Sequence, residues 1–343
     1  MIQLVSLLLI TPMLRIDSFK IKIPVADCLL SFDEGKLNSR QEYDRQLGRF
    51  TKNDLSIANP ALGLKSITYD LLRQEIFIEG SAKALGDQYY ELININTVER
   101  LFGGINDTGC IRLNVPDAIA FSELLKVDTT QNLILPSSSL TYVNSLNEIR
   151  LNSKYQVDPF RKSSNTGIVF KGKQTSFKER QIFYDKSAEI RRDDKLIQAV
   201  GLNKLEAQFK GVLRVESNFT QLRKIKEYCG GRSNLLAVLQ ADAKPNYSLF
   251  KKIAGKTNSI PLFSEYEGYK LMEIEKLEGR KKIIADLNFD LDLINQFIDS
   301  RVGGNNSKYK RQYRELAQQL SGGKSIISIN KHIQEIEDQL QVA

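Results

Sequence analysis

Histidine is almost absent from this chain of 343 residues, which has only one, His332. We expect neither Ser-His-Asp nor Cys-His catalysis, because His332 would have to be the base and the residues around it do not resemble a site. We interpret His332 itself as a solvated residue on a helix face. A zinc or iron site built on imidazole ligands is excluded by the count. Any metal ion must then be held by carboxylates and carbonyl oxygens, which favours Mg²⁺ or Mn²⁺.

Cysteine and long apolar runs are scarce as well. Cys28, Cys110 and Cys229 stand far apart without a CxxC pair, so we predict neither a structural zinc site nor a disulfide framework, and a reducing cytoplasm fits. The apolar run at residues 4–10 is shorter than the roughly 18 residues needed to cross a bilayer, and its flanks lack a basic stretch and a clear cleavage site. We interpret it as a strand or as an extension before a start at Met13, with a signal peptide as the alternative. We expect no membrane association.

Acidic residues are few in one long region of the chain. Between Arg150 and Lys256 there are 23 Lys and Arg against 10 Asp and Glu, whereas the net charge of the whole chain is +8. The remainder is therefore acidic. A regional excess of this kind indicates an anionic partner, nucleic acid first and an acidic membrane second. The other interpretation is a basic surface that is merely solvated.

The order of predicted elements favours an α+β fold, with a largely antiparallel sheet and flanking helices. Strands dominate the first part of the chain, and a hairpin is predicted at residues 167–173 and 180–186. From residue 259 the apolar residues recur with a spacing near 3.6, which predicts helices. We therefore expect a core of residues 1–258 and a helical C-terminal domain of residues 259–343. The second domain would serve dimerisation or, as a helix-turn-helix, DNA binding.

Three acidic residues stand on predicted strands, or at their ends, in runs that otherwise look buried. They are Glu91 in residues 89–95, Asp128 in 125–130 and Glu216 in 212–217. A carboxylate in such a strand is costly to bury unless it is paired or bound to a metal ion. Arg214 and Lys126 could neutralise the acids as ordinary ion pairs. The functional alternative is one divalent cation held by all three acids, which would neutralise a scissile phosphate.

Tyr184 is the candidate nucleophile, near the end of the predicted hairpin. On a strand Tyr184 and Lys186 face the same way, so the ammonium could stabilise the phenolate or the phosphate that it attacks. A free phenol has a pKa near 10 and is a poor nucleophile without such help. Taken alone, Tyr184 is better interpreted as a core residue beside Phe183.

Basic side chains of the hairpin lead directly into this tyrosine. They are Lys171, Lys173, Lys178 and Arg180. Such side chains neutralise phosphates without reading sequence, and Arg214 belongs to the same candidate DNA-binding set. Phe170, Phe177 and Phe183 either stack on unpaired bases or belong to the core.

Four short motifs stand in a fixed order within residues 13–256. They are Tyr90-Glu91-Leu92-Ile93-Asn94, Lys126-Val127-Asp128-Thr129-Thr130, Tyr184-x-Lys186-x-x-Glu189-Ile190 and Leu213-Arg214-Val215-Glu216. Each is weak by itself, but their order and intervals resemble the gene II replication proteins of filamentous phages and, more distantly, the Rep_trans plasmid initiators of rolling-circle replication. Two departures stand out: Asn94 replaces a lysine of the family pattern, and a His-hydrophobic-His metal motif is missing.

The resemblance implies an initiator that nicks one DNA strand at an origin, in the cytoplasm of a bacterial host. Tyr184, helped by Lys186, would form a 5′-phosphotyrosine link, and the released 3′-OH would prime synthesis by a host polymerase, with a host helicase. The divalent metal would be held by Glu91 and Asp128 with Glu216 or Glu189 as third ligand. The alternatives are a non-catalytic repressor or single-strand binder and a conjugative relaxase, and a homodimer is compatible with each.

Overall fold

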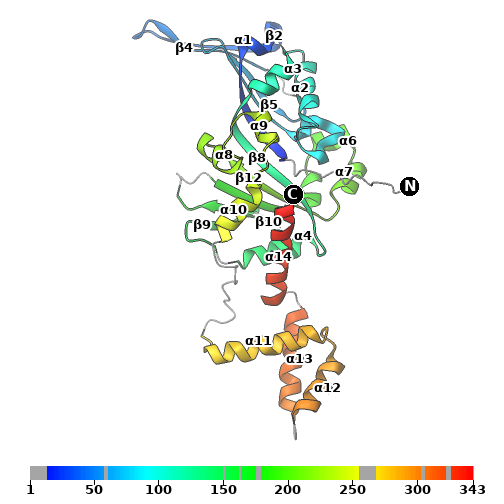
Figure 1. The fold of residues 1–343 in the computed structure, drawn as a ribbon. Helices are drawn as coiled ribbons and strands as arrows, with labels where there is room; N and C mark the ends of the chain where they lie inside the picture. Colours follow the sequence, from blue (N-terminus) through cyan, green and yellow to red (C-terminus); the bar gives the residue numbers. More distant parts are fainter. Residues whose placement is uncertain are drawn as a thin grey trace, which may run out of the picture.

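The structure is a computed structural model that describes residues 14–57, 61–149, 151–161, 164–174, 179–254, 268–302, 306–321 and 326–342 (Figure 1). The run at residues 4–10, Met13 as a start and Lys178 lie outside the described residues. Within the described ranges, no helix combines the length and the apolar character that a membrane span requires.

The chain forms twelve strands, two 3₁₀ helices and fourteen α-helices over these residues. The strands are β1 (Ile16–Pro24), β2 (Leu29–Phe32), β3 (Leu37–Asp44), β4 (Arg49–Ile57), β5 (Leu64–Asp70), β6 (Glu75–Ser81), β7 (Ile111–Leu113), β8 (Glu123–Ile134), β9 (Tyr155–Arg161), β10 (Ser164–Gly172), β11 (Glu179–Asp185) and β12 (Val212–Phe219). The 3₁₀ helices are η1 (Glu34–Lys36) and η2 (Ala82–Glu91). The α-helices are α1 (Val25–Cys28), α2 (Val98–Asp107), α3 (Val115–Phe121), α4 (Ser139–Asn147), α5 (Lys186–Ile190), α6 (Asp194–Val200), α7 (Leu202–Phe209), α8 (Leu222–Tyr228), α9 (Leu235–Leu239), α10 (Pro245–Ala254), α11 (Leu271–Asp286), α12 (Leu291–Arg301), α13 (Ser307–Ser321) and α14 (Ile326–Val342).

Ten of the strands form one sheet, in the order β3-β4-β5-β6-β1-β8-β12-β11-β10-β9, and β2 pairs with β7 separately. The neighbours in the large sheet are antiparallel. The expected α+β fold with an antiparallel sheet is therefore confirmed. The predicted hairpin is β10–β11, and its register sets Gly167 opposite Tyr184 and Lys171 opposite Arg180.

The two faces of this sheet differ in polarity, because successive side chains of a strand point to opposite faces. On one face Phe183 and Val215 are fully buried in the main core, and the ring of Phe250 lies 5.5 Å from that of Phe183. Helices α4, α8, α10 and α14 contact the central strands there. The other face carries the polar side chains of β8, β11 and β12. Helices η2 and α5 contact the strands on this polar side of the sheet. Helix α6 packs on η2, and α7 packs on α5.

The strand predicted at residues 89–95 is wrong. Residues up to Glu91 end η2, Leu92 reverses the chain with a φ of 61°, and Ile93 alone bridges to Ile16 of β1. The turn buries the side chains of Tyr89 and Leu92 completely. The sequence here therefore alternates between polar and apolar residues although it forms no strand. Polar side chains hold the turn in place, since Asn94 donates from its amide to the carbonyl oxygen of Glu91.

The C-terminal helices divide differently from the expected single domain. Helices α11, α12 and α13 share a small core of their own, which includes Ile284, Ile298 and Tyr313. Helix α14 returns instead to the main core, where Ile333, Ile336 and Leu340 are buried against α4 and α10. Because α13 and α14 pack into different cores, the two helices do not form the helix-turn-helix pair considered above.

His332 is a core residue, not the solvated residue expected from the sequence. Its side chain on α14 is 8% exposed, its Nδ1 lies 2.8 Å from the hydroxyl of Ser145 on α4, and its ring packs edge-on against Tyr142. Burial lowers the pKa of His332, with Lys331 adding to the shift and Glu335 opposing it. The misjudgement has a simple cause, since the helix that carries His332 turns this face toward α4.

A buried ion network stabilises the sheet on the face that α8 and α10 cover. Glu179 of β11 is almost fully buried, accepts a hydrogen bond from the hydroxyl of Tyr155 at 2.6 Å, and pairs with Lys224 and Lys252. Burial alone would raise the pKa of Glu179, but the hydrogen bonds from Lys224 and Tyr155 outweigh it, and the pKa is lowered. The carboxylate thus contributes stability above its ordinary pKa that is lost as the pH falls through the lowered one.

We predict that Glu179→Ala lowers the free energy of unfolding by about 3–5 kcal/mol, because Lys224 and Lys252 lose their buried acid and are left with the more exposed Glu227. The control is Glu227→Ala, which removes an acid of the same network whose side chain is 42% exposed, and it should cost less than about 1 kcal/mol. Urea unfolding followed by circular dichroism measures both. Equal losses in the two variants would contradict a buried network centred on Glu179.

Candidate nucleic-acid-binding and active site

The polar face of the sheet contains a basic cleft of about 540 Å³. Lys171, Arg180 and Asn218 stand side by side on β10, β11 and β12, because Lys171 pairs with Arg180 and Arg180 with Asn218. Lys126 enters from β8. The cleft is lined by Lys126, Gln156, Lys171, Gly172, Lys173, Gln174, Glu179, Arg180, Asn218 and Thr220.

Three of the basic residues predicted to bind DNA thus meet in one place, together with Lys126, which was predicted only as an ion-pair partner. Lys173 and Arg180 are exposed and Lys171 forms an ion pair with Asp158 of β9. Lys126 lies 3.7 Å from Glu79. Since Glu179 points to the opposite face and is neutralised there, the cleft has an excess of positive charge suited to a phosphate backbone.

Tyr184 lies on the same face as this cleft, four residues further along β11 from Arg180. Its side chain is only 3% exposed and packs with Val169 and Ile182, while the ring of Phe160 stacks on it at 4.5 Å. Gly167 makes this packing possible, since a Cβ there would come within 2.6 Å of the Cβ of Tyr184. Tyr184 is therefore buried, but in a small cluster on the face opposite to Phe183 and not in the main core beside it.

Glu216 of β12 accepts a hydrogen bond from the hydroxyl of Tyr184 at 2.6 Å. Burial and the nearby charge of Asp17 raise the pKa of Glu216 to about 7, against the opposing effect of Arg214. Burial and the charge of Glu216 raise the pKa of Tyr184 well above that of a free phenol. A carboxylate with a pKa near 7 is suited to act as a general base, and Glu216 contacts the proton that it would remove.

Arg214 is completely buried beside this pair, so it is not the surface DNA contact predicted from the sequence. Its Nη1 donates to the hydroxyl of Tyr89 at 2.9 Å and to Asp17 at 3.2 Å, and its Nε donates to Asn132 at 2.9 Å. Its Nη2 is buried and has no hydrogen-bond acceptor among the described residues. An orphaned guanidinium N–H is unusual in a protein interior and fits a site for an anionic oxygen.

Asp17 reaches the site because β1 is irregular at this point. The pairing of β1 with β8 shifts register between Ile16 and Ser18, as in a β-bulge, and the polar pair Asp17-Ser18 interrupts the alternation of the strand. Its carboxylate contacts Arg214. Sequence reasoning missed Asp17, although two adjacent polar residues in an otherwise alternating strand are a recognisable sign of a bulge.

Lys186 lies beside Tyr184 for a reason other than the one predicted. The strand ends at Asp185, whose side chain accepts from the backbone N–H of Ala188 and caps α5. Lys186 opens the helix, donates to Glu189 at 2.5 Å, and places its ammonium 5.6 Å from the ring of Tyr184. Burial and Arg214 lower the pKa of Lys186. The lysine and glutamate of the motif are therefore an ion pair within one helical turn.

The proposed metal ligands are only partly brought together. Asp128 and Glu216 are diagonal neighbours on β8 and β12, but Asp128 is bound by Ser18 and Asn218, and Glu91 is exposed at the end of η2. The described residues contain no group of three His, Cys, Asp or Glu side chains that could hold a metal ion. The set of Glu91, Asp128 and Glu216 therefore does not fit a divalent cation here, and Arg214 neutralises the acids nearest to Tyr184.

Comparison with known proteins adds little to this geometry. No known protein family and no curated protein sequence matches the chain. Among solved structures it is similar to the rolling-circle replication initiator protein from Geobacillus stearothermophilus, with 13% identity and a TM-score of 0.30 over 60% of this chain and 74% of that one. A similarity this remote does not bear on the activity.

Other residues that shape the site come from distant parts of the sequence. Tyr89 of η2 and Phe209 of α7 place their rings within 5.8 Å of the ammonium of Lys186, and both pack against Arg214. Phe160 of β9 covers Tyr184. Their apolar character marked them in the sequence only as core residues, because each meets its partners across different strands and helices.

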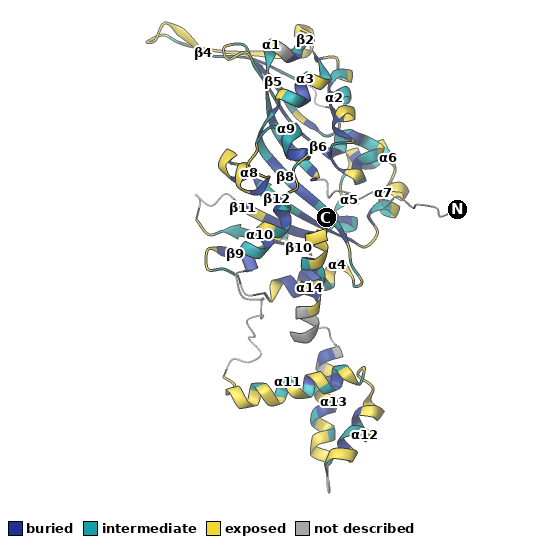
Figure 2. Cartoon of the chain, in the orientation of Figure 1, coloured by how far each residue is buried: buried dark blue, intermediate teal, exposed yellow. Residues whose placement is uncertain are grey.

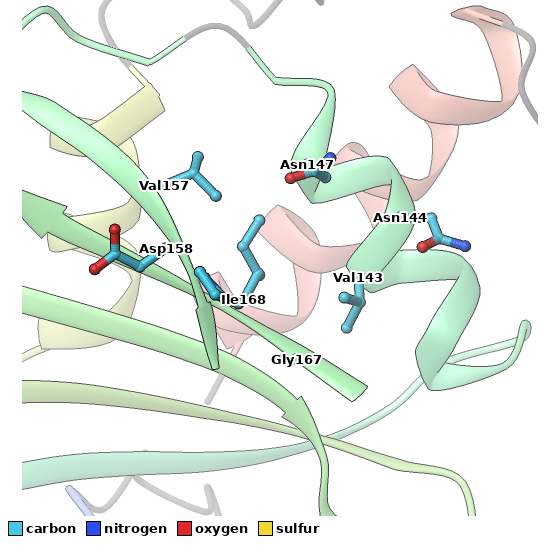
Figure 3. Close-up of a pocket in the computed structure, with 8 residues that line it drawn as sticks. Val143, Asn144, Asn147, Val157, Asp158, Gly167 and Ile168 are labelled. Carbon is cyan, nitrogen blue, oxygen red and sulfur yellow. The ribbon is translucent and has the colours of Figure 1, made fainter. Parts of the chain in front are cut away.

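A separate pocket of about 330 Å³ lies between α4 and the β9–β10 hairpin (Figure 3). Val143, Asn144 and Asn147 line it from the helix and Val157 and Ile168 from the strands. Ile168 and Tyr184 point to opposite faces of the sheet, since Gly167 is the residue that pairs with Tyr184. The side chain of Ile168 thus lines the pocket from the face opposite to Tyr184, although Gly167, which packs against Tyr184, also lines it.

We predict that the double variant Lys126→Gln, Arg180→Gln weakens binding to a labelled single-stranded oligonucleotide and lowers the slope of log affinity against log salt by about 1.4, at roughly 0.7 per phosphate contact. The matched control, Arg223→Gln with Lys226→Gln, removes the same charge from exposed positions of α8. Fluorescence anisotropy at several salt concentrations measures both. If the control changed the slope as much as the cleft variant, the cleft would not be the binding surface.

Proposed function

We propose that the chain is a rolling-circle replication initiator that nicks one DNA strand through attack by Tyr184. One observation carries the proposal: the hydroxyl of Tyr184 donates to Glu216, a carboxylate of raised pKa, beside the unsatisfied Nη2 of Arg214 and on the face that holds the basic cleft. Nucleophile, base and anion-binding group are thus contiguous, and such a set suits attack on a phosphodiester.

The proposed step is a transesterification in which the chain's own residues move the proton and hold the phosphate. Glu216 accepts the phenolic proton of Tyr184 as the phenolate oxygen forms a bond to phosphorus. Nη2 of Arg214 donates to a non-bridging phosphate oxygen. The bond from phosphorus to the 3′-oxygen breaks, and that oxygen leaves as a 3′-hydroxyl with a proton from solvent. One ester replaces another, so the reverse reaction rejoins the strand without ATP.

This chemistry requires the site to open, because Tyr184 and Arg214 are both buried. Phe160 is the side chain that stacks on the tyrosine, and it belongs to the end of β9, at the margin of the sheet. We infer that DNA displaces Phe160 and reaches Tyr184 from this side. The basic cleft would meanwhile hold the strand that continues past the scissile phosphate.

A divalent ion and the protein partners stay predictions. Asp17 and Glu216 offer two carboxylates near Tyr184, and Mg²⁺ in phosphoryl-transfer sites is commonly held by one or two carboxylates and by substrate phosphates. Nicking that persists in excess EDTA would remove Mg²⁺ and Mn²⁺ from the proposal. A host polymerase and helicase, a cytoplasmic location and a homodimer follow from the proposed role and not from the fold.

The second candidate is a DNA-binding protein without catalysis, a repressor or single-strand binder. The burial of Tyr184 and the engagement of Asp17 and Glu216 by Arg214 favour it, since an ion network of this kind also stabilises a sheet. A conjugative relaxase would use the same chemistry, and neighbouring genes for transfer or for phage structure would separate it from a replication initiator.

We predict that the purified protein converts a supercoiled plasmid carrying its own gene and flanking DNA into open circles with covalently bound protein, and that Tyr184→Phe abolishes the adduct while DNA affinity is kept. The control is Tyr90→Phe, a neighbouring tyrosine of η2 whose ring packs on Phe209. Agarose gels with and without protease digestion distinguish the products. Equal nicking by wild type and Tyr184→Phe would exclude Tyr184 as nucleophile.

We also predict that nicking under single-turnover conditions becomes faster as the pH rises through about 7, because Glu216 accepts a proton only in its ionised form and its pKa is raised to about 7. Glu216→Gln should slow the step about 10²–10⁴-fold and remove this pH dependence. Glu189→Gln, which affects the Lys186 ion pair, should keep the pH dependence. A rate that falls as the pH rises would contradict Glu216 as base.

A further inference from the structure

A two-stranded ribbon, made by β3 and β4, projects from the margin of the sheet opposite to β9 (Figure 1). Strand β4 pairs with β5 only at Asp54, Leu55 and Ser56, whereas β3 and β4 pair along their whole length. Beyond these three residues the ribbon has no third strand, and Figure 2 shows it exposed along most of its course. We call residues 43–50 the tip of this ribbon.

The tip has an ordered construction despite its exposure. The carboxylate of Asp44 accepts from the backbone N–H groups of Gln46 and Leu47, and Gly48 provides the left-handed conformation, with a φ of 63°. Tyr43 and Phe50 form a cross-strand pair with edge-to-face rings 5.2 Å apart. These contacts matter because an isolated hairpin is only marginally stable in water.

The tip displays an apolar wedge between two arginines. Leu47 is 58% exposed at the apex, and the rings of Tyr43 and Phe50 are exposed directly below it. Further down the ribbon Arg40 and Lys52 are neutralised by Glu42 and Asp54. No ion pair among the described residues involves Arg45 or Arg49, and Asp44, the one acid of the tip, is engaged in the turn.

We propose that this tip binds duplex DNA, with Arg45 and Arg49 on phosphates and Leu47 pressed against a base step in the groove. Charge selects this partner: two unneutralised arginines beside an apolar apex attract a polyanion and repel the same tip of a second copy. β-Ribbons enter DNA grooves, and apolar side chains with neighbouring arginines act as wedges between base pairs. The ribbon has the two strands and the exposed apolar residues that this mode needs.

The position of the ribbon specifies which duplex it would meet, and this part rests on the proposed nicking function. Six strand spacings separate β4 from β11 in the sheet, which is about 29 Å at roughly 4.8 Å each. The tip lies further out still, beyond the residues of β4 that pair with β5. It would therefore contact the duplex that flanks the origin and not the nicked phosphate itself.

The test compares two variants with the wild-type full-length chain. One is the double variant Arg45→Gln, Arg49→Gln, and the other is the single variant Leu47→Ser. The probes are a labelled blunt duplex of about two helical turns and a labelled oligothymidylate, followed by anisotropy. We expect the arginine variant to bind the duplex about 10-fold more weakly, with a salt slope lower by about 1.8, and to bind the oligothymidylate as wild type does. Leu47→Ser should weaken duplex binding without changing the salt slope.

The matched controls are Arg73→Gln and Leu72→Ser at the exposed turn between β5 and β6, which should leave both probes unaffected. Unchanged duplex affinity in the tip variants would overturn the proposal, as would an equal loss on both probes. A wild-type dimer that becomes a monomer in Leu47→Ser would overturn it in favour of self-association. Tyr184→Phe should bind the duplex normally, so a failure of nicking and a failure of the tip are told apart.

Discussion

The buried guanidinium of Arg214 is the interaction on which the rest of the site depends. It lies in the middle of the sheet, and it links β12 to β1 through Asp17, to β8 through Asn132 and to η2 through Tyr89. Burying this charge is tolerable only because these acceptors converge on it. The same charge keeps a second carboxylate, Glu216, ionisable near pH 7 and beside Tyr184.

The sheet around this cluster separates an apolar core from a charged surface. One face is filled by apolar side chains and by α4, α8, α10 and α14, whereas the other carries the cluster at one end and the basic cleft beside it. Antiparallel strands permit this division, since each strand contributes alternate residues to the core and to the open face. Phe160, Tyr89 and Phe209 cover the cluster, and in the proposed reaction DNA displaces Phe160.

Local patterns were sufficient for the hairpin β10–β11, for β12 and for the convergence of Lys171, Lys173 and Arg180, because strand periodicity fixes which side chains share a face. The same patterns failed where the outcome depends on distant contacts. Glu91 stands in a 3₁₀ helix that is held in place by the hydrogen bond from Arg214 to Tyr89. Asp17 reaches the site through a bulge in β1. Helix α14 packs into the main core and not with α13. Strand periodicity was enough to set Tyr184 near Glu216. The burial of Tyr184, however, depends on Phe160, which stands 24 residues earlier in the chain.

The most direct test of the account is to identify the residue that becomes linked to DNA. The protein is incubated with a supercoiled plasmid carrying its own gene and flanking DNA, the nucleic acid is digested, and the peptides are sequenced by mass spectrometry. The account predicts a nucleotide on the peptide that contains Tyr184, through its phenolic oxygen. A nucleotide on another tyrosine, or nicked DNA without any peptide attached, would contradict it.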